Sequence, residues 1–182
     1  MGRSSKEQTD ANHQRIVTAA GNLFRSRGYD AVGIADVMKA AGMTQGGFYK
    51  HFASKEALAA EAWRQGFELS SAIWRRKEKG SPAADIIDYY LAPKPPEYRC
   101  PMVAHGEEAA RMSEDCALRE VYAEGTQNLY DTFMEASKGS MPKDRARLLF
   151  AAMVGVNMLS RAAGDTEWIA ALKKSVKTAM AK

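Results

Sequence analysis

The chain has 182 residues, of which 46% are hydrophobic and 26% are charged, with 26 Lys and Arg residues against 22 Asp and Glu residues. This composition excludes an intrinsically disordered chain, and the length suits one domain or two small ones. Two cysteines and a polar N-terminal segment exclude a disulfide scaffold and a signal peptide, so we expect a cytoplasmic protein.

The first third of the chain has the apolar spacing of three helices. Apolar residues recur every three or four positions up to Gly28, which is expected to end the first helix. A second helix is expected over 34–40, and Gly42 separates it from a third that Thr44 caps and that runs to about His51. Two short helices joined by a glycine turn are typical of a helix-turn-helix, whose second helix lies in the major groove of DNA.

The rest of the chain is also helical by its pattern. Ser54 is expected to cap a helix of about six turns, and Ser81-Pro82 has the form of another helix start. The segment 93–96 holds three prolines and cannot be helical. Further helices are expected over about 101–112, 116–137, 143–163 and 166–180. No stretch alternates with period two, so the predicted fold is all-α with about nine helices.

Two features of the last two helices bear on assembly and membranes. The apolar stretch 148–159 is interrupted by Gly155 and Asn157 and is expected to be too short to span a bilayer. The last helix is expected to place its apolar residues on one face, namely Trp168, Leu172, Val176 and Ala179. Small residues on the penultimate helix permit close helix approach, either in a dimer interface or in the core of a monomer. They are Ala146, Ala151, Ala152, Gly155, Ala162, Ala163 and Gly164.

The segment after the glycine turn carries residues that suit DNA. Gln45 can pair with adenine through two hydrogen bonds, while Gly46 and Gly47 allow the backbone to come close. Phe48 is expected to point into the core. The side chains expected to donate to phosphates or to add positive charge are Tyr49, Lys50, His51 and Lys55.

Positive charge is concentrated in the same part of the chain. Residues 1–55 hold eight Lys and Arg residues against four Asp and Glu residues, whereas the remaining residues hold 18 of each sign. A basic head on a neutral body favours binding to a polyanion such as DNA. A chance surplus on a solvated face would give the same numbers.

Along residues 12–60 the apolar, glycine and polar positions occur in a characteristic order. They read Ile16-x6-Leu23-Phe24-x3-Gly28-Tyr29, then Ile34-x-Asp36-Val37, then Ala41-Gly42-Met43-Thr44-x-Gly46-x-Phe48-Tyr49-x-His51-Phe52-x-Ser54-Lys55-Glu56-x-Leu58. This set resembles the DNA-binding domain of TetR/AcrR-family transcriptional regulators. By that match, the positions that contact DNA are Thr44, Gln45, Gly47, Tyr49, Lys50, His51 and Lys55.

The resemblance also implies an organisation for the whole chain. It implies a helix-turn-helix domain over 1–55 and a helical effector-binding and dimerisation domain over 56–182. The implied protein is a ligand-responsive regulator, most often a repressor in this family, that is released from DNA by a small molecule. The implied partners are a palindromic operator, an unknown effector and a second copy of the chain, bound through the last two long helices.

Three positions depart from the family pattern. Val32 and Gly33 stand where a pair of hydroxyl residues usually starts the second helix, so Gly33 is expected to act as a weak cap without a phosphate contact. Ala35 stands where some members have an arginine that reaches a base. Arg3 and Lys6 on an N-terminal arm are expected to compensate through phosphate or minor-groove contacts.

The aromatic and Met residues of the body can line an effector pocket, although ordinary core packing uses the same residue types. Those selected as ligand-binding are Trp63, Tyr89, Met102, His105, Met112, Tyr122, Phe133 and Met153. His105 is also expected on a polar helix face. Neither a cofactor nor a metal is expected, because the spacing of Cys100, His105 and Cys116 matches no standard zinc pattern.

Cys100 lies between Arg99 and Pro101, the expected first residue of a helix. A thiol at a helix N-terminus beside a guanidinium is expected to be reactive, which favours a redox or electrophile sensor; a small buried thiol is the alternative.

Two other protein classes stay open. One is a small helical thiol enzyme, which is disfavoured because no nucleotide loop, paired carboxylates or base partner for Cys100 is evident. The other is a protein that coats DNA without reading its sequence.

Overall fold

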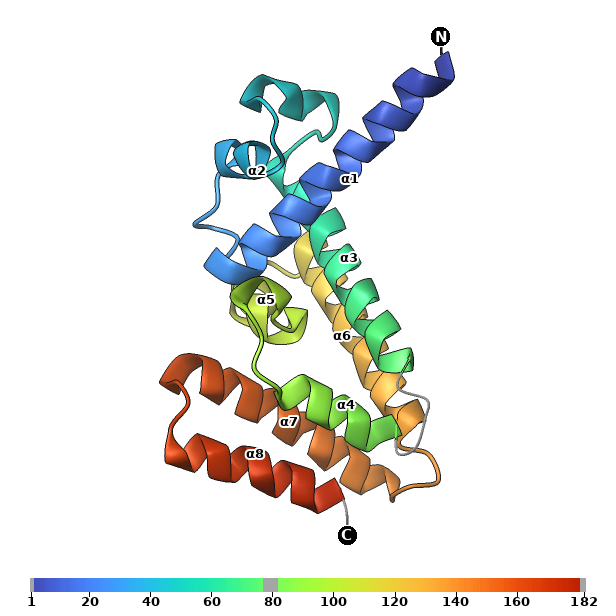
Figure 1. The fold of residues 1–182 in the computed structure, drawn as a ribbon, viewed down its shortest axis with the longest axis vertical. Helices are drawn as coiled ribbons and strands as arrows, with labels where there is room; N and C mark the ends of the chain where they lie inside the picture. The colour runs from blue at the N-terminus through green and yellow to red at the C-terminus, as the bar shows by residue number, and fades with distance from the viewer. Residues whose placement is uncertain (1, 77–81, 181–182) are drawn as a thin grey trace. The chain divides into compact units, whose positions relative to one another are not determined.

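The computed structural model describes residues 2–76 and 82–180, and in these ranges the chain is all-helical (Figure 1). The described residues form eight α-helices and two short 3-10 helices. In chain order they are α1 (Gly2–Arg27), α2 (Ile34–Ala40), η1 (Gln45–Lys50), α3 (Lys55–Arg75), α4 (Pro82–Leu91), η2 (Pro96–Tyr98), α5 (Pro101–Arg111), α6 (Ala117–Ala136), α7 (Lys143–Ala163) and α8 (Glu167–Met180). The predicted fold class is confirmed.

The chain forms two compact units. The first contains residues 1–66 and 95–123, and the second contains residues 67–94 and 124–182. Both α3 and α6 therefore begin in the first unit and end in the second. Because packing groups α5 with the N-terminal helices, the units do not follow the predicted boundary between residues 55 and 56, which stays a prediction about function.

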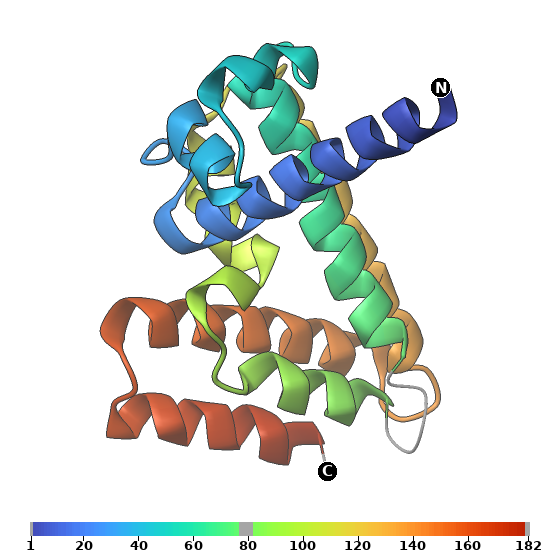
Figure 2. The same cartoon turned by 45° about the horizontal axis from the view of Figure 1, so that its top comes forward.

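In the first unit, α1 packs against α2, η2 and α5. Its N-terminal turns extend beyond the other helices of the unit in two views (Figures 1 and 2). The helix ends where Gly28 adopts φ +92°, a conformation that favours glycine, so the predicted stop is confirmed. The buried core of this unit includes Ile16, Phe24, Phe48, Leu58 and Trp63.

Two glycines bring helices of the first unit close together. A Cβ on Gly21 of α1 would lie 3.6 Å from the carbonyl oxygen of Ala62 on α3, and one on Gly66 would lie 2.8 Å from the guanidinium of Arg25. Arg25 donates from Nε to the carbonyl oxygen of Glu97 in η2 at 2.7 Å. Gly66 therefore leaves the space through which Arg25 connects α1 to the segment before α5.

In the second unit, α4, α7 and α8 pack on one another, and the C-terminal halves of α3 and α6 lie side by side. A Cβ on Gly125 of α6 would fall 2.2 Å from Cγ of Phe67 on α3, so only glycine fits there. The Ser71 and Thr132 hydroxyls are 3.2 Å apart in a buried hydrogen bond between the same two helices. Close approach and a satisfied polar pair thus fix α3 against α6.

Most predicted boundaries agree with the structure to within a residue or two. The Ser54 hydroxyl accepts a hydrogen bond from the Ala57 N–H at 3.0 Å, which confirms the predicted cap of α3. Pro82 begins α4, whereas the Ser81 cap lies outside the described residues. Pro96 was expected to be non-helical, but it opens η2, because the fixed φ of proline suits the first position of a helical turn.

The predicted apolar face of α8 is wrong, and the stretch 148–159 is part of a longer apolar helix. The apolar stretch 148–159 belongs to the 21-residue helix α7, which by length and composition alone could cross a membrane. Only 22% of its apolar window is buried, so much of this apolar character faces outward. On α8, Ile169 and Val176 are buried, whereas Trp168 is 50% exposed and does not share their face. The predicted apolar face of α8 omitted Ile169, its most buried residue.

Candidate nucleic-acid interface

The segment 43–51 is a short helical turn whose orientation is fixed by Phe48. Gly42 adopts φ +70°, and the chain then turns so that the Met43 N–H donates to the Met38 carbonyl at 2.8 Å. Phe48 is fully buried and packs against Phe52, with ring centroids 5.8 Å apart. The prediction that Phe48 points inward is confirmed.

The turn is a 3-10 helix, and the predicted cap is wrong in one respect. Thr44 occupies the N-cap position, but its hydroxyl makes no capping hydrogen bond. Two adjacent glycines disfavour a regular α-helix, and a run of six residues is short enough for 3-10 geometry. The six residues therefore form a 3-10 helix, and the Thr44 hydroxyl does not cap it.

The predicted DNA-contacting residues form an exposed set around buried Phe48. Five of them are exposed, and Tyr49 shows 72% of its surface. The exposed residues are Thr44, Gln45, Gly46, Tyr49 and Lys50, and the half-buried ones are Gly47, His51 and Lys55. One amide, one phenol and one ammonium therefore face outward from a single turn, which is the donor set that base edges and phosphates require.

Gly46 has no steric partner among the described residues. A Cβ placed on it would meet no atom within 4 Å, and one on Gly47 would meet only the Met38 methyl at 3.7 Å. Neither residue has a positive φ. Packing within the described part of the chain thus gives no reason for glycine at position 46.

His51 belongs to a cluster that sequence reasoning did not find. The His13 ring of α1 lies 6.2 Å from the His51 ring and stacks on Phe52 at 4.4 Å. Its Nε2 lies 2.7 Å from Oε1 of Glu61 on α3. No short-range pattern links these residues, because they come from three different elements.

The start of α2 lacks hydroxyl groups, as the sequence indicated. Gly33 is the N-cap residue, and its N–H donates to Oδ2 of Asp36 at 2.9 Å. Val32 is fully buried and Ala35 is exposed. Position 32 therefore contributes to the core, and the start of α2 presents backbone groups rather than a side-chain hydroxyl.

The N-terminal segment is helical instead of being an extended arm. Helix α1 begins at Gly2 and includes exposed Lys6, so a minor-groove arm is absent from this conformation. The side chain of Arg3 lies outside the described residues. Phosphate contact by Lys6 stays a prediction.

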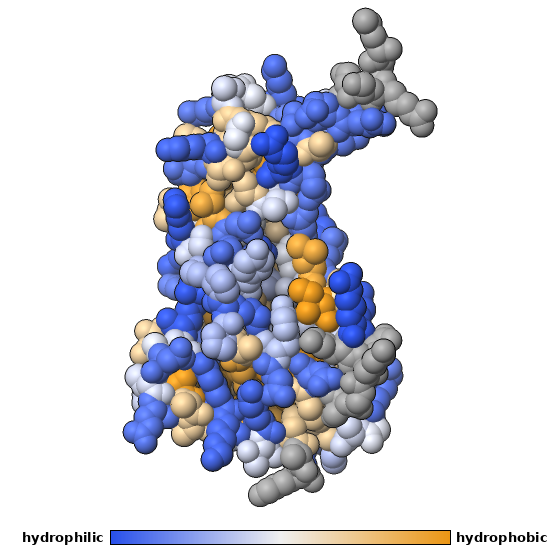
Figure 3. Space-filling model, in the orientation of Figure 1, coloured by the Kyte–Doolittle hydropathy of each residue, from blue (hydrophilic) through white to orange (hydrophobic). Residues whose placement is uncertain are grey.

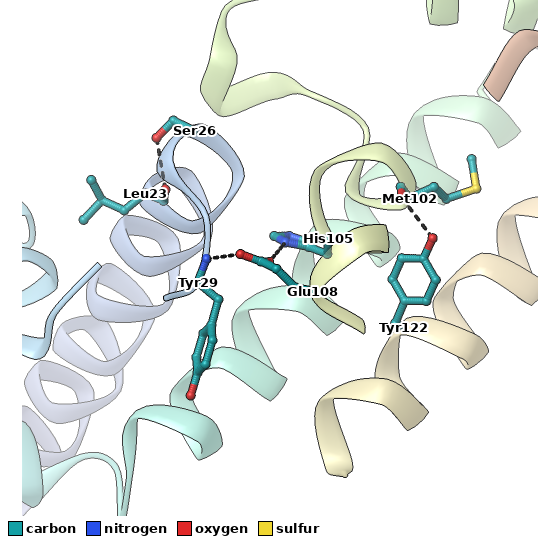
Figure 4. A network of polar contacts seen from close by, with 7 residues as sticks. All are labelled: Leu23, Ser26, Tyr29, Met102, His105, Glu108 and Tyr122. Carbon is teal, nitrogen blue, oxygen red and sulfur yellow. Dashed lines mark hydrogen bonds and ion pairs between the residues drawn. The ribbon is translucent and has the colours of Figure 1, made fainter. Parts of the chain in front are cut away.

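The predicted effector residues fall into both units. Trp63, Met102, His105, Met112 and Tyr122 belong to the first unit, and the other three, Tyr89, Phe133 and Met153, belong to the second. Within the first unit, the Tyr122 hydroxyl donates to the Met102 carbonyl at 2.9 Å (Figure 4). A separate hollow of about 480 Å³ in the second unit is lined by the end of α6 and the α6–α7 turn, including Tyr130, Met134 and Met141. None of the eight lines it, so their role in binding stays a prediction.

The expectation that His105 lies on a polar face is wrong. His105 is 1% exposed and stacks on Trp63, with ring centroids 4.2 Å apart and planes at 15°. Its Nδ1 lies 3.4 Å from Oε2 of Glu108 (Figure 4). The distant Trp63 supplies the surface that buries this ring, and the local polarity of α5 gave no sign of it. Within the described residues no group of three His, Cys, Asp or Glu side chains is placed to hold a metal.

Cys100 is the N-cap residue of α5 and is half-buried. The guanidinium that interacts with it electrostatically is Arg25 of α1. Burial lowers the pKa of Arg25, and the nearby groups of Tyr98, Cys100 and Glu97 act in the opposite direction. The thiol therefore lies beside a partly desolvated cation at a helix N-terminus.

The molecular face in view is largely hydrophilic, with smaller hydrophobic patches between polar side chains (Figure 3).

Comparison with known proteins finds relatives in sequence and in fold. Residues 16–62 match the family model described as bacterial regulatory proteins, tetR family. The chain is 35% identical over 63 residues to the HTH-type transcriptional regulator AcrR of Shigella flexneri, a match that covers 35% of this chain and 29% of AcrR.

Another relative is the HTH-type transcriptional repressor DhaR of Mycobacterium sp. (strain GP1), at 32% identity over 43% of this chain and 41% of DhaR. The chain thus spans less than half the length of these two relatives. The crystal structure of a TetR transcriptional regulator from Chloroflexus aurantiacus has the same fold, with a TM-score of 0.78 and 24% identity over 97% of each chain. The helix-turn-helix segment 16–62 thus matches bacterial regulatory proteins of the tetR family, and the chain as a whole has the fold of a solved TetR transcriptional regulator.

Proposed function

We propose that this protein is a transcriptional regulator that binds a palindromic DNA operator as a homodimer and represses until a small-molecule effector releases it. The observation that carries the proposal is the exposed polar turn around buried Phe48. Gln45, Tyr49 and Lys50 all face outward, so they can meet a groove without any rearrangement of the core. Gln45 is the residue suited to reading a base, and the others are suited to phosphates.

A stripe of small and apolar residues supports the dimer. On α7 the residues that recur at spacings of three and four and face outward or lie half-buried are Leu148, Ala151, Gly155, Met158 and Ala162. Leu148 is 71% exposed and Met158 is 55% exposed. On α8 the corresponding exposed residues are Trp168, Ala171, Ser175 and Thr178. This stripe, which we call the α7–α8 stripe, is the seam that two antiparallel helix pairs need for close packing.

The test is selection of bound duplexes from a random DNA pool by the full-length protein. We expect enrichment of a palindrome whose half-sites lie about one helical turn apart, because two related heads reach successive major grooves. Failure to enrich any sequence would instead indicate a protein that coats DNA and would overturn the proposal.

A second candidate, supported by the Arg25–Cys100 interaction, is that Cys100 senses electrophiles. A cation beside a thiol stabilises the thiolate, which adds to electrophilic double bonds. Treatment with N-ethylmaleimide is then expected to weaken operator binding by the wild type and by Cys116→Ser, but not by Cys100→Ser. Equal effects on all three proteins would exclude this role, as would no effect on the wild type.

A further inference from the structure

Lys55, the first residue of α3, has a defined partner although it is expected to contact DNA. Its ammonium nitrogen lies 4.1 Å from the centroid of the Tyr29 ring. An aromatic face attracts a cation at this distance because the electron density above the ring is negative. Lys55 is also half-buried, so its long side chain is restricted before any DNA arrives.

The Tyr29 ring is held in place by buried aromatic side chains. It packs against Phe24 with ring centroids 5.5 Å apart, and its plane stands at 81° to the ring of Trp63. Both Phe24 and Trp63 are fully buried. Burial, followed by the carboxylates of Glu56 and Asp30, raises the pKa of Tyr29, so the phenol stays neutral at physiological pH. The ring therefore presents a constant face to Lys55.

The backbone of Tyr29 is held as well (Figure 4). Its N–H donates to Oε1 of Glu108 on α5. Gly28 before it has a positive φ, and a Cβ on Gly28 would lie 3.0 Å from the same carboxylate oxygen. The second oxygen of Glu108 faces buried His105. Tyr29 is thus fixed at both its ring and its main chain.

We propose that Tyr29 is a positioning residue for DNA binding, holding the Lys55 ammonium where it meets a phosphate. The proposal rests on the proposed function, because it takes Lys55 as a phosphate contact. It adds a residue that acts through Lys55. A lysine held in one rotamer loses less entropy on binding than a free one, so removal of the ring should weaken binding only through Lys55.

The experiment is a double-mutant cycle on the duplex obtained by selection. Lys55→Met is expected to weaken binding to all sequences alike and to lower the salt slope by about one. Tyr29→Leu is expected to weaken binding about two- to fivefold, whereas Tyr29→Phe keeps the ring and the wild-type affinity. In the Lys55→Met background, Tyr29→Leu is expected to have no further effect.

A result in which the effects of Tyr29→Leu and Lys55→Met multiply would overturn the positioning role. So would a Tyr29→Leu protein with wild-type affinity. The proposed function fails on a different result, namely that the wild type selects no duplex. Lys55→Met with wild-type affinity and salt slope would remove the phosphate contact and this inference with it, while leaving the regulator intact.

A measurement on the wild type keeps the test decisive if Tyr29→Leu does not fold. In protein labelled with carbon-13 lysine, the resonance missing from the Lys55→Met spectrum identifies Lys55. Its ε-protons are expected upfield of the other lysines in the wild type and in Tyr29→Phe, because they lie over a ring face. A shift at the average lysine position would contradict the proposal.

Discussion

Gly46 is a residue whose identity packing within the chain does not explain. Its missing side chain leaves open space, and its φ is not positive. We predict that Gly46→Ala stabilises the free protein by about 0.5 kcal/mol, because alanine loses less backbone entropy on folding. We also predict at least a tenfold loss of operator affinity, because the methyl group stands between the turn and the DNA backbone. Thermal unfolding and a DNA titration of the same sample measure both effects.

The two directions of change make this prediction specific. A general structural defect would lower stability and affinity together, whereas a steric block at the interface separates them. Gly47→Ala is the comparison variant at the neighbouring position, since a Cβ on residue 47 would reach only the flexible end of the Met38 side chain. Gly46→Ala with wild-type affinity would mean that no DNA backbone comes close at this position.

At the residue scale, sequence patterns predicted those features that depend on near neighbours. The inward Phe48, the stop at Gly28 and the Ser54 cap all follow from spacing within one or two turns. The burial of His105 and the Lys55–Tyr29 contact did not follow, because Trp63 and Tyr29 come from other elements. The chemistry of such a side chain is evident in the sequence, but its neighbours are set by tertiary packing.

Helices α3 and α6 approach each other closely at Gly125. A Cβ on Gly125 would overlap the Phe67 ring at 2.2 Å, and Phe67 is itself buried. We predict that Gly125→Ala lowers the free energy of unfolding by about 1–3 kcal/mol, although alanine is the better helix former. Urea denaturation measures this change. Gly125→Ala combined with Phe67→Leu should recover part of the loss, and no recovery would point to a cause other than this overlap.

The turn between α7 and α8 contains a pH-dependent contact. Lys173 donates to Asp165 at 2.8 Å, and the Ser160 hydroxyl donates to it at 3.1 Å. These hydrogen bonds, that of Lys173 first, lower the pKa of Asp165. Because the folded-state pKa is depressed, the contribution to stability is present above the unfolded-state pKa of about 3.9 and is lost as the pH falls through the folded value.

We therefore predict that Asp165→Asn is less stable than the wild type at pH 7, with a difference that shrinks towards zero in strong acid. The effect is expected to be small, because Asp165 is exposed and solvent screens the contact. Thermal melts of both proteins across this pH range measure it. A difference that grows as the pH falls would have the wrong sign for this account.

At the element scale, the pattern located the helices well and their type less well. The bounds of α2 and α7 agree with prediction, since apolar periodicity and flanking glycines or prolines mark them clearly. The 3-10 form of η1 was not predicted, because a run of six residues with two glycines gives too little periodicity to distinguish two helix types. The Thr44 hydroxyl was predicted to cap this turn, but it makes no capping hydrogen bond.

At the scale of the whole molecule, the α7–α8 stripe is the feature most exposed to test. Leu148→Glu places a charge on an apolar seam, and we predict that it shifts the protein from dimer to monomer at micromolar concentration. Analytical ultracentrifugation measures the mass. Lys143→Glu, on the same helix but outside the stripe, introduces the same side chain at an exposed position and should remain a dimer.

A Leu148→Glu protein that stays dimeric would place the interface elsewhere. If it becomes monomeric, its affinity for the palindrome should fall far more than its affinity for a single half-site.

The sequence predicted which helices to examine, because small residues recur along α7. It could not predict that Trp168 faces outward, since that depends on which side of α8 packs against α4 and α7.

The central claim is that the turn beginning at Thr44 reads DNA sequence, and Gln45 is its base-reading residue. The most direct measurement is a titration of the wild type and Gln45→Ala against the selected duplex and all its single-base variants. We predict that the wild type loses about 1–3 kcal/mol at one base pair of each half-site, and that Gln45→Ala loses this discrimination there alone. An unchanged pattern of discrimination in Gln45→Ala would contradict the account.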